Sequence, residues 1–172
     1  MLGRVPLWET AQHCHQLLRE AGLPHAVAGG VAVCLHGYRR NTTDLDILIR
    51  QSLISGGYTW NESDCEFLSP QQIPVPFLPS GSPTGKSGSG PLLPDPSDES
   101  VVATIEELPV LTLARLIESK IACGQDHVRR THKDFADVVE LIDVHQLGRD
   151  YARFLHKSVR KTFRELVLRS RM

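Results

Sequence analysis

The amino-acid sequence predicts an α+β fold with a mixed β-sheet and a C-terminal run of helices. Apolar residues recur at helical spacing from Leu7 to Gly22 and again beyond residue 112. Between these regions, HAVAGG and DLDILI have the short apolar or alternating character of strands, and a helix-like run from about Gly30 to Gly37 separates them. The order helix, strand, helix, strand, followed by more short strands, indicates that the sheet is mixed.

Further strands and helices complete the predicted order. The first helix ends at a glycine, which suits a helix C-terminus. Short strands are expected in GYTW, CEFL and IPVPFL, although two prolines restrict the last to an edge or irregular strand. VVATIEELPVL predicts one or two strands. The helices expected after it run from about Thr112, a suitable N-cap, to Cys123, from His127 to Leu147, and from Asp150 to Arg169.

These elements divide the chain into a core, residues 1–111, and a helical segment, residues 112–172, which is expected to pack on the core and close over its cleft. Within the core, residues 79–98 are expected to form a flexible loop, because residues 79–90 are Pro, Gly or Ser at ten of twelve positions. GSPTGKS inside this loop imitates a phosphate-binding loop. Only three residues separate Gly81 from Gly85, where that motif needs four, so we do not assign it that function.

The composition is that of an ordinary globular chain, with 172 residues, of which 41% are hydrophobic and 23% charged. No apolar run approaches the ~18 residues that could span a bilayer, and the N-terminus lacks a signal-peptide segment, so we expect a cytoplasmic protein without a membrane partner. The four cysteines are far apart in sequence and are expected to be reduced. Cys123, His127 and His132 have no fourth ligand nearby and do not predict a zinc site.

Charge is distributed unevenly along the chain. Residues 149–172 carry eight Lys or Arg and two Asp or Glu, although the net charge of the whole chain is −1. In the last predicted helix, basic residues lie opposite an apolar stripe. That basic face is either simply solvated or a surface for RNA or an acidic partner.

The most informative stretch is GGVAVCLHGYRRNTTDLDILIR, residues 29–50. Alternate side chains of a strand share a face, so Asp44 and Asp46 are expected on one side. Two carboxylates about 7 Å apart repel each other by on the order of 2 kcal/mol at an effective dielectric near 20, which a hard cation such as Mg²⁺ would offset. Gly29 and Gly30 end a strand at the start of a helix, where the missing Cβ would let a phosphate approach backbone N–H groups.

Together, these two features resemble the signature of the nucleotidyltransferase superfamily. Thirteen residues separate Gly30 from Asp44, and Arg40, Thr42, Asp44 and Asp46 occupy every second position. The chain is more closely similar to the bacterial abortive-infection (AbiEii-like) nucleotidyltransferases, which include toxins of toxin–antitoxin pairs. The resemblance implies a polymerase-beta-like nucleotidyltransferase fold for the α+β core.

The resemblance also implies an activity, which is in-line transfer of a nucleotidyl group from a nucleoside triphosphate to a hydroxyl acceptor on a protein or a tRNA. Mg²⁺ or Mn²⁺ would be held by Asp44 and Asp46. The residues that would bind the nucleotide near these acids are Gly29, Gly30, Arg40 and Thr42. A cognate antitoxin protein is a further partner that such a family implies.

LTLARLIESKIACG and RRTHKDFADVVELI are similar to later motifs of that family. The resemblance implies catalytic roles for Lys120 and Asp137 and nucleotide binding by Lys133 and Asp134. From the residues alone, Lys120 projects from the centre of an apolar helix stripe, so it either extends to solvent or meets an anion. That anion is an intramolecular carboxylate or, as the resemblance implies, a nucleotide phosphate. Asp137 faces away from the apolar stripe of its helix, so it is either a site residue or a solvated acid.

Catalytic members of this fold normally add a third carboxylate from a neighbouring strand, as general base or metal ligand. The corresponding position in this sequence is Pro76, which can neither bind a metal nor accept a proton. Either Glu66 in CEFL is the third metal ligand, or the metal site is incomplete. The alternative function is therefore a catalytically degenerate relative that binds a nucleotide or a protein partner without transfer.

Overall fold

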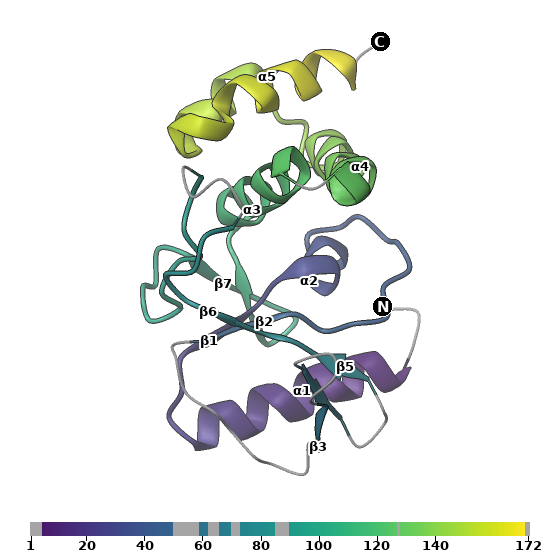
Figure 1. Cartoon of the computed structure of the whole chain (residues 1–172), viewed down its shortest axis with the longest axis vertical. Helices are drawn as coiled ribbons and strands as arrows, with labels where there is room; N and C mark the ends of the chain where they lie inside the picture. The colour runs from purple at the N-terminus through teal and green to yellow at the C-terminus, as the bar shows by residue number, and fades with distance from the viewer. Residues whose placement is uncertain are drawn as a thin grey trace.

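The computed structural model describes residues 5–49, 59–61, 66–69, 73–84, 90–126 and 128–170. A five-stranded sheet lies between helix α1 (Val5–Glu20) on one face and helix α2 (Gly29–Leu35) on the other (Figure 1). Helices α3 (Leu113–Asp126) and α4 (Val128–Val144) form a layer beyond α2, and α5 (Arg160–Arg169) covers that layer on its outer side. Within the described ranges, no helix combines the length and the apolar character needed to cross a membrane. The α+β class with C-terminal helices is confirmed.

The five-stranded sheet is mixed, as the sequence predicts. Its strands are β1 (His25–Val27), β2 (Ile47–Ile49), β6 (Phe77–Pro79), β7 (Val102–Ile105) and β8 (Leu108–Leu111), and their order in space is β6-β2-β1-β8-β7. β2 runs antiparallel to β1 and parallel to β6, whereas β8 runs parallel to β1 and antiparallel to β7. Val27, the last residue of β1, pairs with Ile47 of β2 and Val110 of β8. The turn from β1 into α2 therefore leaves the sheet from its middle strand.

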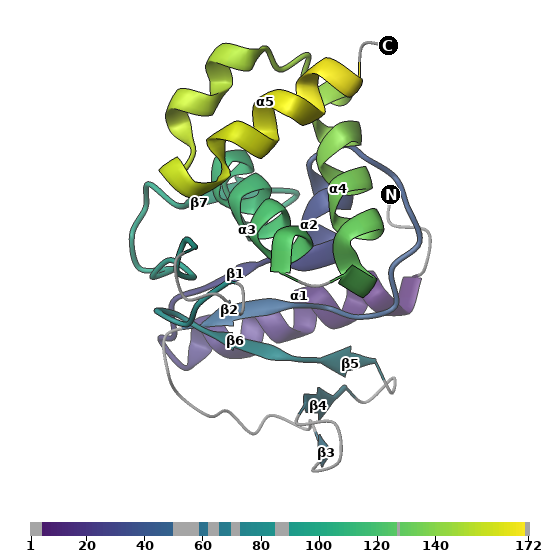
Figure 2. The same ribbon diagram turned by 45° about the horizontal axis from the view of Figure 1, so that its top comes forward.

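A second, three-stranded sheet extends from the first (Figure 2). It consists of β3 (Thr59–Asn61), β4 (Glu66–Leu68) and β5 (Pro74–Val75) in that order, with both pairings antiparallel. Pro76 separates β5 from β6, which agrees with the irregular strand expected for a segment in which proline lacks a backbone donor. GYTW, CEFL and IPVPFL thus each contain strand residues, as predicted.

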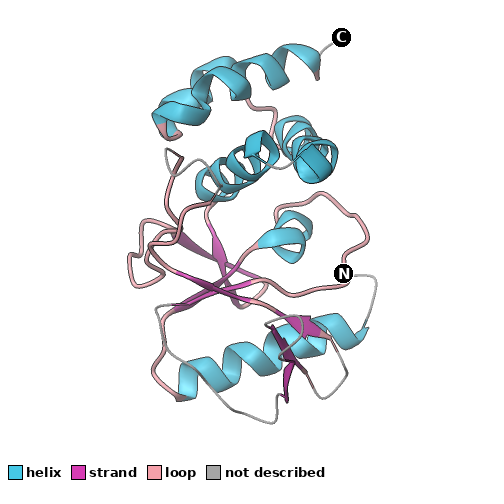
Figure 3. Cartoon of the chain, viewed as in Figure 1, coloured by secondary structure: helices cyan, strands magenta, loops and turns pink. Residues whose placement is uncertain are grey.

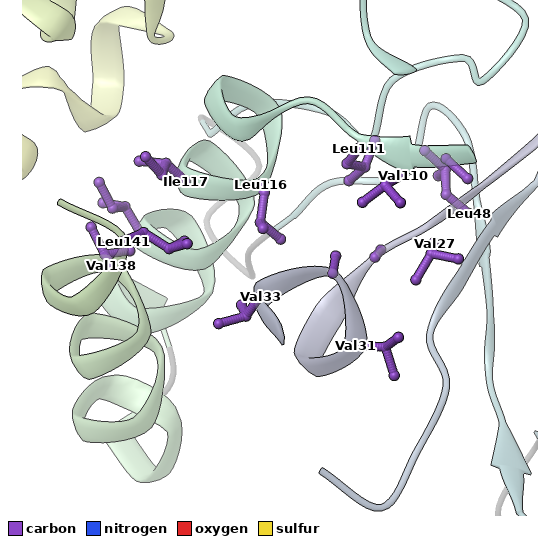
Figure 4. Close-up of a cluster of buried hydrophobic side chains, with 14 of the residues drawn as sticks. Val27, Val31, Val33, Leu48, Val110, Leu111, Leu116, Ile117, Val138 and Leu141 are labelled. Atoms are coloured by element: carbon purple, nitrogen blue, oxygen red, sulfur yellow. The ribbon is translucent and has the colours of Figure 1, made fainter. Parts of the chain in front are cut away.

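Apolar side chains from the sheet and from the helices form one continuous core (Figure 4). Residues of the sheet, of α2 and of the α3–α4 pair all contribute to it. The labelled members are Val27, Val31, Val33, Leu48, Val110, Leu111, Leu116, Ile117, Val138 and Leu141, all at most 1% exposed. Each such side chain contributes about 1.5–3 kcal/mol through burial, so this core fixes the helices against the sheet.

The single helix predicted from Asp150 to Arg169 is wrong. Two 3₁₀ turns, η1 (Arg149–Phe154) and η2 (Lys157–Val159), precede α5. A short loop separates η1 from η2 (Figure 3). The backbone at Leu155 is extended, and the N–H of His156 donates to the buried carboxylate of Glu118 on α3. Because this N–H bonds to a side chain, it cannot join a helical ladder, and the helix is interrupted there.

Where residues 79–98 are described, their two ends pair with each other. The N–H of Gly81 donates to the carbonyl of Leu93 (2.8 Å), and the N–H of Thr84 donates to the carbonyl of Pro91 (3.2 Å). Thr84 is buried, and its carbonyl accepts a hydrogen bond from Sγ of Cys123 on α3 (2.9 Å). Backbone pairing and the contact with α3 therefore place this part of the expected loop beside the helical segment.

Candidate functional site

The turn between β1 and α2 brings a glycine against a carboxylate. Gly29 has a φ of 56°, a conformation that residues with side chains rarely adopt. A Cβ added at Gly29 would lie 2.5 Å from Cγ of Asp46, and closer still to Oδ2. The carboxylate of Asp46 thus occupies space that only a glycine leaves open.

The second glycine contacts the residues that lead to the other acid. A Cβ added at Gly30 would lie 2.8 Å from Nη2 of Arg40 and would overlap Oγ1 of Thr42. The same Oγ1 donates a hydrogen bond to Oδ1 of Asp44 (3.2 Å). Asp44 is therefore connected to the glycine turn through the buried Thr42.

Asp44 and Asp46 precede β2 rather than lie within it, because the strand begins at Ile47. The strand predicted for DLDILI is thus wrong in its first three residues. The alternation on which the prediction depended is present nevertheless, since Leu45 is fully buried and both acids are partly exposed. The carbonyl of Asp46 accepts a hydrogen bond from the N–H of Ala28 (2.9 Å), which holds this segment beside the glycine turn.

A cavity of about 150 Å³ opens next to Gly29 and Asp46. Its opposite side includes Lys120 of α3 and Asp134 of α4. The remaining lining residues are mostly apolar or carry small polar groups: Ala28, Leu78, Pro83, Thr84, Leu93, Leu111, Ser119 and Cys123. One cavity therefore brings together residues of the sheet, the 79–98 segment and the helices.

Lys120 is a buried cation, 5% exposed, with carboxylate partners on α4. Its Nζ donates to Oδ1 of Asp134 (3.0 Å) and lies 2.9 Å from Oδ2 of Asp137. Of the two partners that the sequence allowed, the structure contains the intramolecular carboxylates. They offset the cost of burying the ammonium group, which also lines the cavity.

Asp137 is 1% exposed, so the alternative of a solvated surface acid is wrong. Its Oδ1 lies 2.7 Å from Nε of Arg40, and Nη2 of Arg40 donates to its Oδ2 (3.1 Å). Asp137 lies off the apolar stripe of α4, which is why the sequence left a solvated position open. The segment that carries Arg40 covers this second side of the helix.

Arg40, Lys120, Asp134 and Asp137 form one buried ionic network of two cations and two anions, which we call the Arg40–Asp134 network. The network connects the glycine turn to α3 and α4. Lys133, also expected in the site, is exposed on α4 and does not line the cavity.

The segment nearest to Asp46 has Pro76, and not an acid, at the position where a third carboxylate was expected. The carbonyl of Pro76 accepts a hydrogen bond from the N–H of Ile47 (3.3 Å), so the segment with Pro76 runs beside the residues that follow Asp46. Glu66 lies in β4, which pairs with β5, so β5 lies between β4 and the segment of the two aspartates. The described residues contain no group of three or more His, Cys, Asp or Glu arranged to hold a metal ion.

Sequence reasoning missed several residues of the cavity. Cys123 lies one helical turn after Lys120, and Ser119 precedes it, so the helical register of α3 was an available signal for both. Thr84 and Leu93 had no such signal, because they reach the cavity through the pairing of loop ends.

Comparison with known proteins yields little further information. No family model matches the chain, and no curated protein matches it. Among solved structures, the crystal structure of JHP933 from Helicobacter pylori aligns with 95% of this chain and 91% of that chain, at 16% sequence identity and a TM-score of 0.40. A likeness at this level establishes neither a shared fold nor a shared function.

Proposed function

We propose that this protein is a divalent-cation-dependent nucleotidyltransferase of the AbiEii-like type, with a polymerase-beta-like fold. The observation that carries the proposal is the contact between Asp46 and Gly29 at a cavity that Lys120 also lines. A metal-bound triphosphate needs an oxygen ligand for the cation, close approach to the backbone and a positive charge. Asp46 supplies the carboxylate oxygen, and Lys120 brings an ammonium group, paired with Asp134 and Asp137, to the same cavity. At Gly29, the missing Cβ leaves the space that the Asp46 carboxylate fills.

The acids at the glycine turn fit Mg²⁺ or Mn²⁺, because both cations prefer oxygen ligands. Asp44 and Asp46 are only partly buried, and Asp46 lines the cavity. When bound, the cation would neutralise charge on the triphosphate. With two acids at the turn, the proposal is one metal ion whose remaining ligands are water and phosphate. A second ion would need Glu66, whose strand is separated from the two aspartates by β5.

The charges of the site make nucleotide binding depend on the cation. Asp44 and Asp46 place two carboxylates at the glycine turn. A triphosphate brings several more negative charges, which repel the two acids unless a divalent cation lies between them. We therefore expect nucleotide binding only in the presence of Mg²⁺ or Mn²⁺.

In the proposed reaction, a hydroxyl oxygen of a protein or tRNA acceptor bonds to the α-phosphorus of the nucleotide. The bond from this phosphorus to the leaving oxygen breaks, pyrophosphate departs, and the hydroxyl proton passes to a carboxylate or to water. Gly29, Gly30 and Thr42 would position the phosphates, and Lys120 would stabilise the developing negative charge. Asp134 and Asp137 would orient Lys120, and Asp137 would also hold Arg40 beside Gly30.

The second candidate function is binding without transfer. Pro76 favours it, because the strand beside Asp46 offers no acid at that position to act as base or to complete a two-metal site. In that case the protein would bind a metal-bound nucleotide, or a partner such as a cognate antitoxin, and would release the nucleotide unchanged.

Incubation with each labelled nucleoside triphosphate, Mg²⁺ and a mixture of tRNA and protein acceptors distinguishes the two functions. Labelled acceptor that disappears in an Asp46→Asn variant would support transfer. Cation-dependent nucleotide binding without labelled acceptor would support the non-catalytic function. Absence of cation-dependent nucleotide binding in the wild-type protein would rule out transfer and nucleotide binding alike, and would leave only the binding of a protein partner.

A second experiment addresses the third carboxylate. If transfer needs a second metal ion held by Glu66, Glu66→Gln should reduce transfer, and Pro76→Asp should raise it by restoring an acid beside Asp46. If neither variant changes the rate, the two-metal form of the proposal is wrong. Circular dichroism of both variants controls for loss of fold.

A further inference from the structure

The C-terminal segment, Arg149–Ser170, has one apolar and one basic side. It lies over α3 and α4 on the side away from the sheet (Figures 1 and 2). Its inward side chains are buried: Ala152, Leu155, Val159, Phe163, Leu166 and Val167. The side that faces away from the protein is therefore free to carry charge without a cost in core packing.

That outward side is strongly basic. Between residues 149 and 170 there are two acids, Asp150 and Glu165, and seven cations: Arg149, Arg153, Lys157, Arg160, Lys161, Arg164 and Arg169. All of these cations except Arg160 are exposed. Within the described ranges, none of the seven forms an ion pair with a carboxylate. Their charges are therefore available to a partner.

Arg160 joins the two parts of this surface. Its Nε donates to the carbonyl of Leu155 (2.8 Å), and its Nη2 donates to the carbonyl of Arg153 (3.3 Å). The end of η1 is thereby held beside the start of α5. Arg164 follows one turn later on α5, so Arg153, Arg160 and Arg164 lie on one side of the segment, whereas Arg169 lines a groove beside α4.

An exposed aromatic ring lies among these cations. Phe154 is 52% exposed, and the guanidinium of Arg153 lies 4.7 Å from the centre of its ring. The Tyr151 ring, half-buried, lies 5.4 Å from the same ring, centre to centre. On α5, Leu168 is 50% exposed, one turn beyond Arg164. A ring that is half exposed contributes little to the core, and its exposed part can stack on a base.

We propose that this basic surface, Arg149 to Arg164 with Phe154, binds single-stranded RNA. Clustered Lys and Arg side chains gain affinity from a phosphate backbone by releasing its counterions, and exposed aromatic rings stack on unpaired bases. An acidic protein could also bind these cations, and competition by polyglutamate, described below, distinguishes it from RNA. The choice of RNA over single-stranded DNA rests on the proposed transfer to a hydroxyl acceptor. The proposal that the surface binds a nucleic acid does not depend on that transfer.

The test is fluorescence anisotropy with a labelled oligouridylate of about 15 nucleotides, within the range of site sizes of single-strand binders. The assay contains neither nucleoside triphosphate nor divalent cation. The wild-type protein should bind with an affinity that falls as salt increases. The double variant Lys157→Glu/Lys161→Glu should bind at least about tenfold more weakly, and its dependence of log K on log salt should be shallower by roughly 1.4, or 0.7 per lost phosphate contact.

The matched control is Arg19→Glu/Arg39→Glu, which changes the net charge by the same amount at exposed positions outside this surface. It should keep close to wild-type affinity, and equal losses in both double variants would overturn the proposal. Phe154→Ala should weaken binding about tenfold with an unchanged salt slope, as expected for a stacking contact. Thermal unfolding of each variant excludes loss of fold as the cause.

Two further outcomes would overturn the assignment. Polyglutamate that competes as well as RNA would indicate an acidic protein partner, and equal affinity for the matching oligodeoxynucleotide would remove the choice of RNA. Asp46→Asn should bind the oligouridylate like the wild type, because this surface does not include Asp46. Failure of nucleotidyl transfer and failure of RNA binding are thus measured separately.

Discussion

Arg40 and Asp137 are 97 residues apart in the sequence, yet Nε of Arg40 lies 2.7 Å from Oδ1 of Asp137. The side chains are 12% and 2% exposed. Asp137 is also an ion-pair partner of Lys120, so a single carboxylate balances cations from two different parts of the chain. This ion pair ties the glycine turn, through Arg40, to the C-terminal helices.

The first prediction concerns this ion pair. Asp137→Asn should lower the free energy of unfolding by about 3–5 kcal/mol, because it leaves Arg40 and Lys120 without their shared buried carboxylate. Urea unfolding measures the loss. Asp143→Asn, an exposed acid on the same helix, is the control and should stay within about 0.5 kcal/mol of the wild type. A loss below about 1 kcal/mol at Asp137 would mean that the pair behaves like a surface salt bridge.

The second prediction separates backbone strain from side-chain overlap at Gly29. Gly22→Ala, at a φ of 67° with nothing within 4 Å of the added Cβ, should cost about 1–2 kcal/mol from backbone conformation alone. Gly29→Ala should cost more, because the new methyl group also displaces the carboxylate of Asp46. Chemical denaturation of both variants provides the comparison, and equal losses would mean that Asp46 moves aside freely.

The third prediction concerns the packing of α3 on α4. A Cβ added at Gly124 would lie 2.5 Å from a carbon of the Phe135 ring. Gly124→Ala should therefore destabilise the protein by about 1–3 kcal/mol, as overpacking does. The double variant Gly124→Ala/Phe135→Leu should be more stable than the sum of the two single losses predicts, since the smaller side chain makes room. Strict additivity in thermal unfolding would contradict the direct contact.

The fourth prediction is a pH dependence of stability. Burial lowers the pKa of His36 below its ordinary value of 6.5, the carbonyl of Leu111 opposes this shift, and nearby His145 adds to it. Because the folded pKa is depressed, the unfolded chain binds the proton first as the pH falls. Stability attributable to His36 is therefore fully present above about pH 6.5 and decreases below it, by at most about 1.4 kcal/mol per pH unit.

His36→Gln should flatten this profile between pH 7 and pH 5, because glutamine can still donate to the Leu111 carbonyl but does not titrate. Unfolding free energies measured across that range test the prediction. His132→Gln, at an exposed position on α4, controls for the loss of an imidazole elsewhere. If the unfolding free energy of the His36 variant falls with pH as steeply as that of the wild type, other groups cause the pH dependence. Burial also lowers the pKa of His25, so some slope should remain.

Much of the fold follows from local patterns. A short apolar run such as HAVAGG, and the alternation around Leu45, report which side chains are buried wherever the strand lies in the sheet. Asp44 and Asp46 could be recognised for this reason, although the strand itself begins at Ile47. The polymerase-beta-like fold and the transferase activity stay predictions, since they depend on a resemblance rather than on a pattern of burial.

Only the tertiary structure decided how the site residues are partnered. Helical periodicity describes one face of α4, so it could not reveal that Arg40 buries Asp137 from another side. The N–H of His156 is taken by Glu118, which interrupts a helix that the local spacing favours. Buried charges and interrupted helices depend on partners far away in the sequence, and the free energy of each contact exists only once the chain has folded around it.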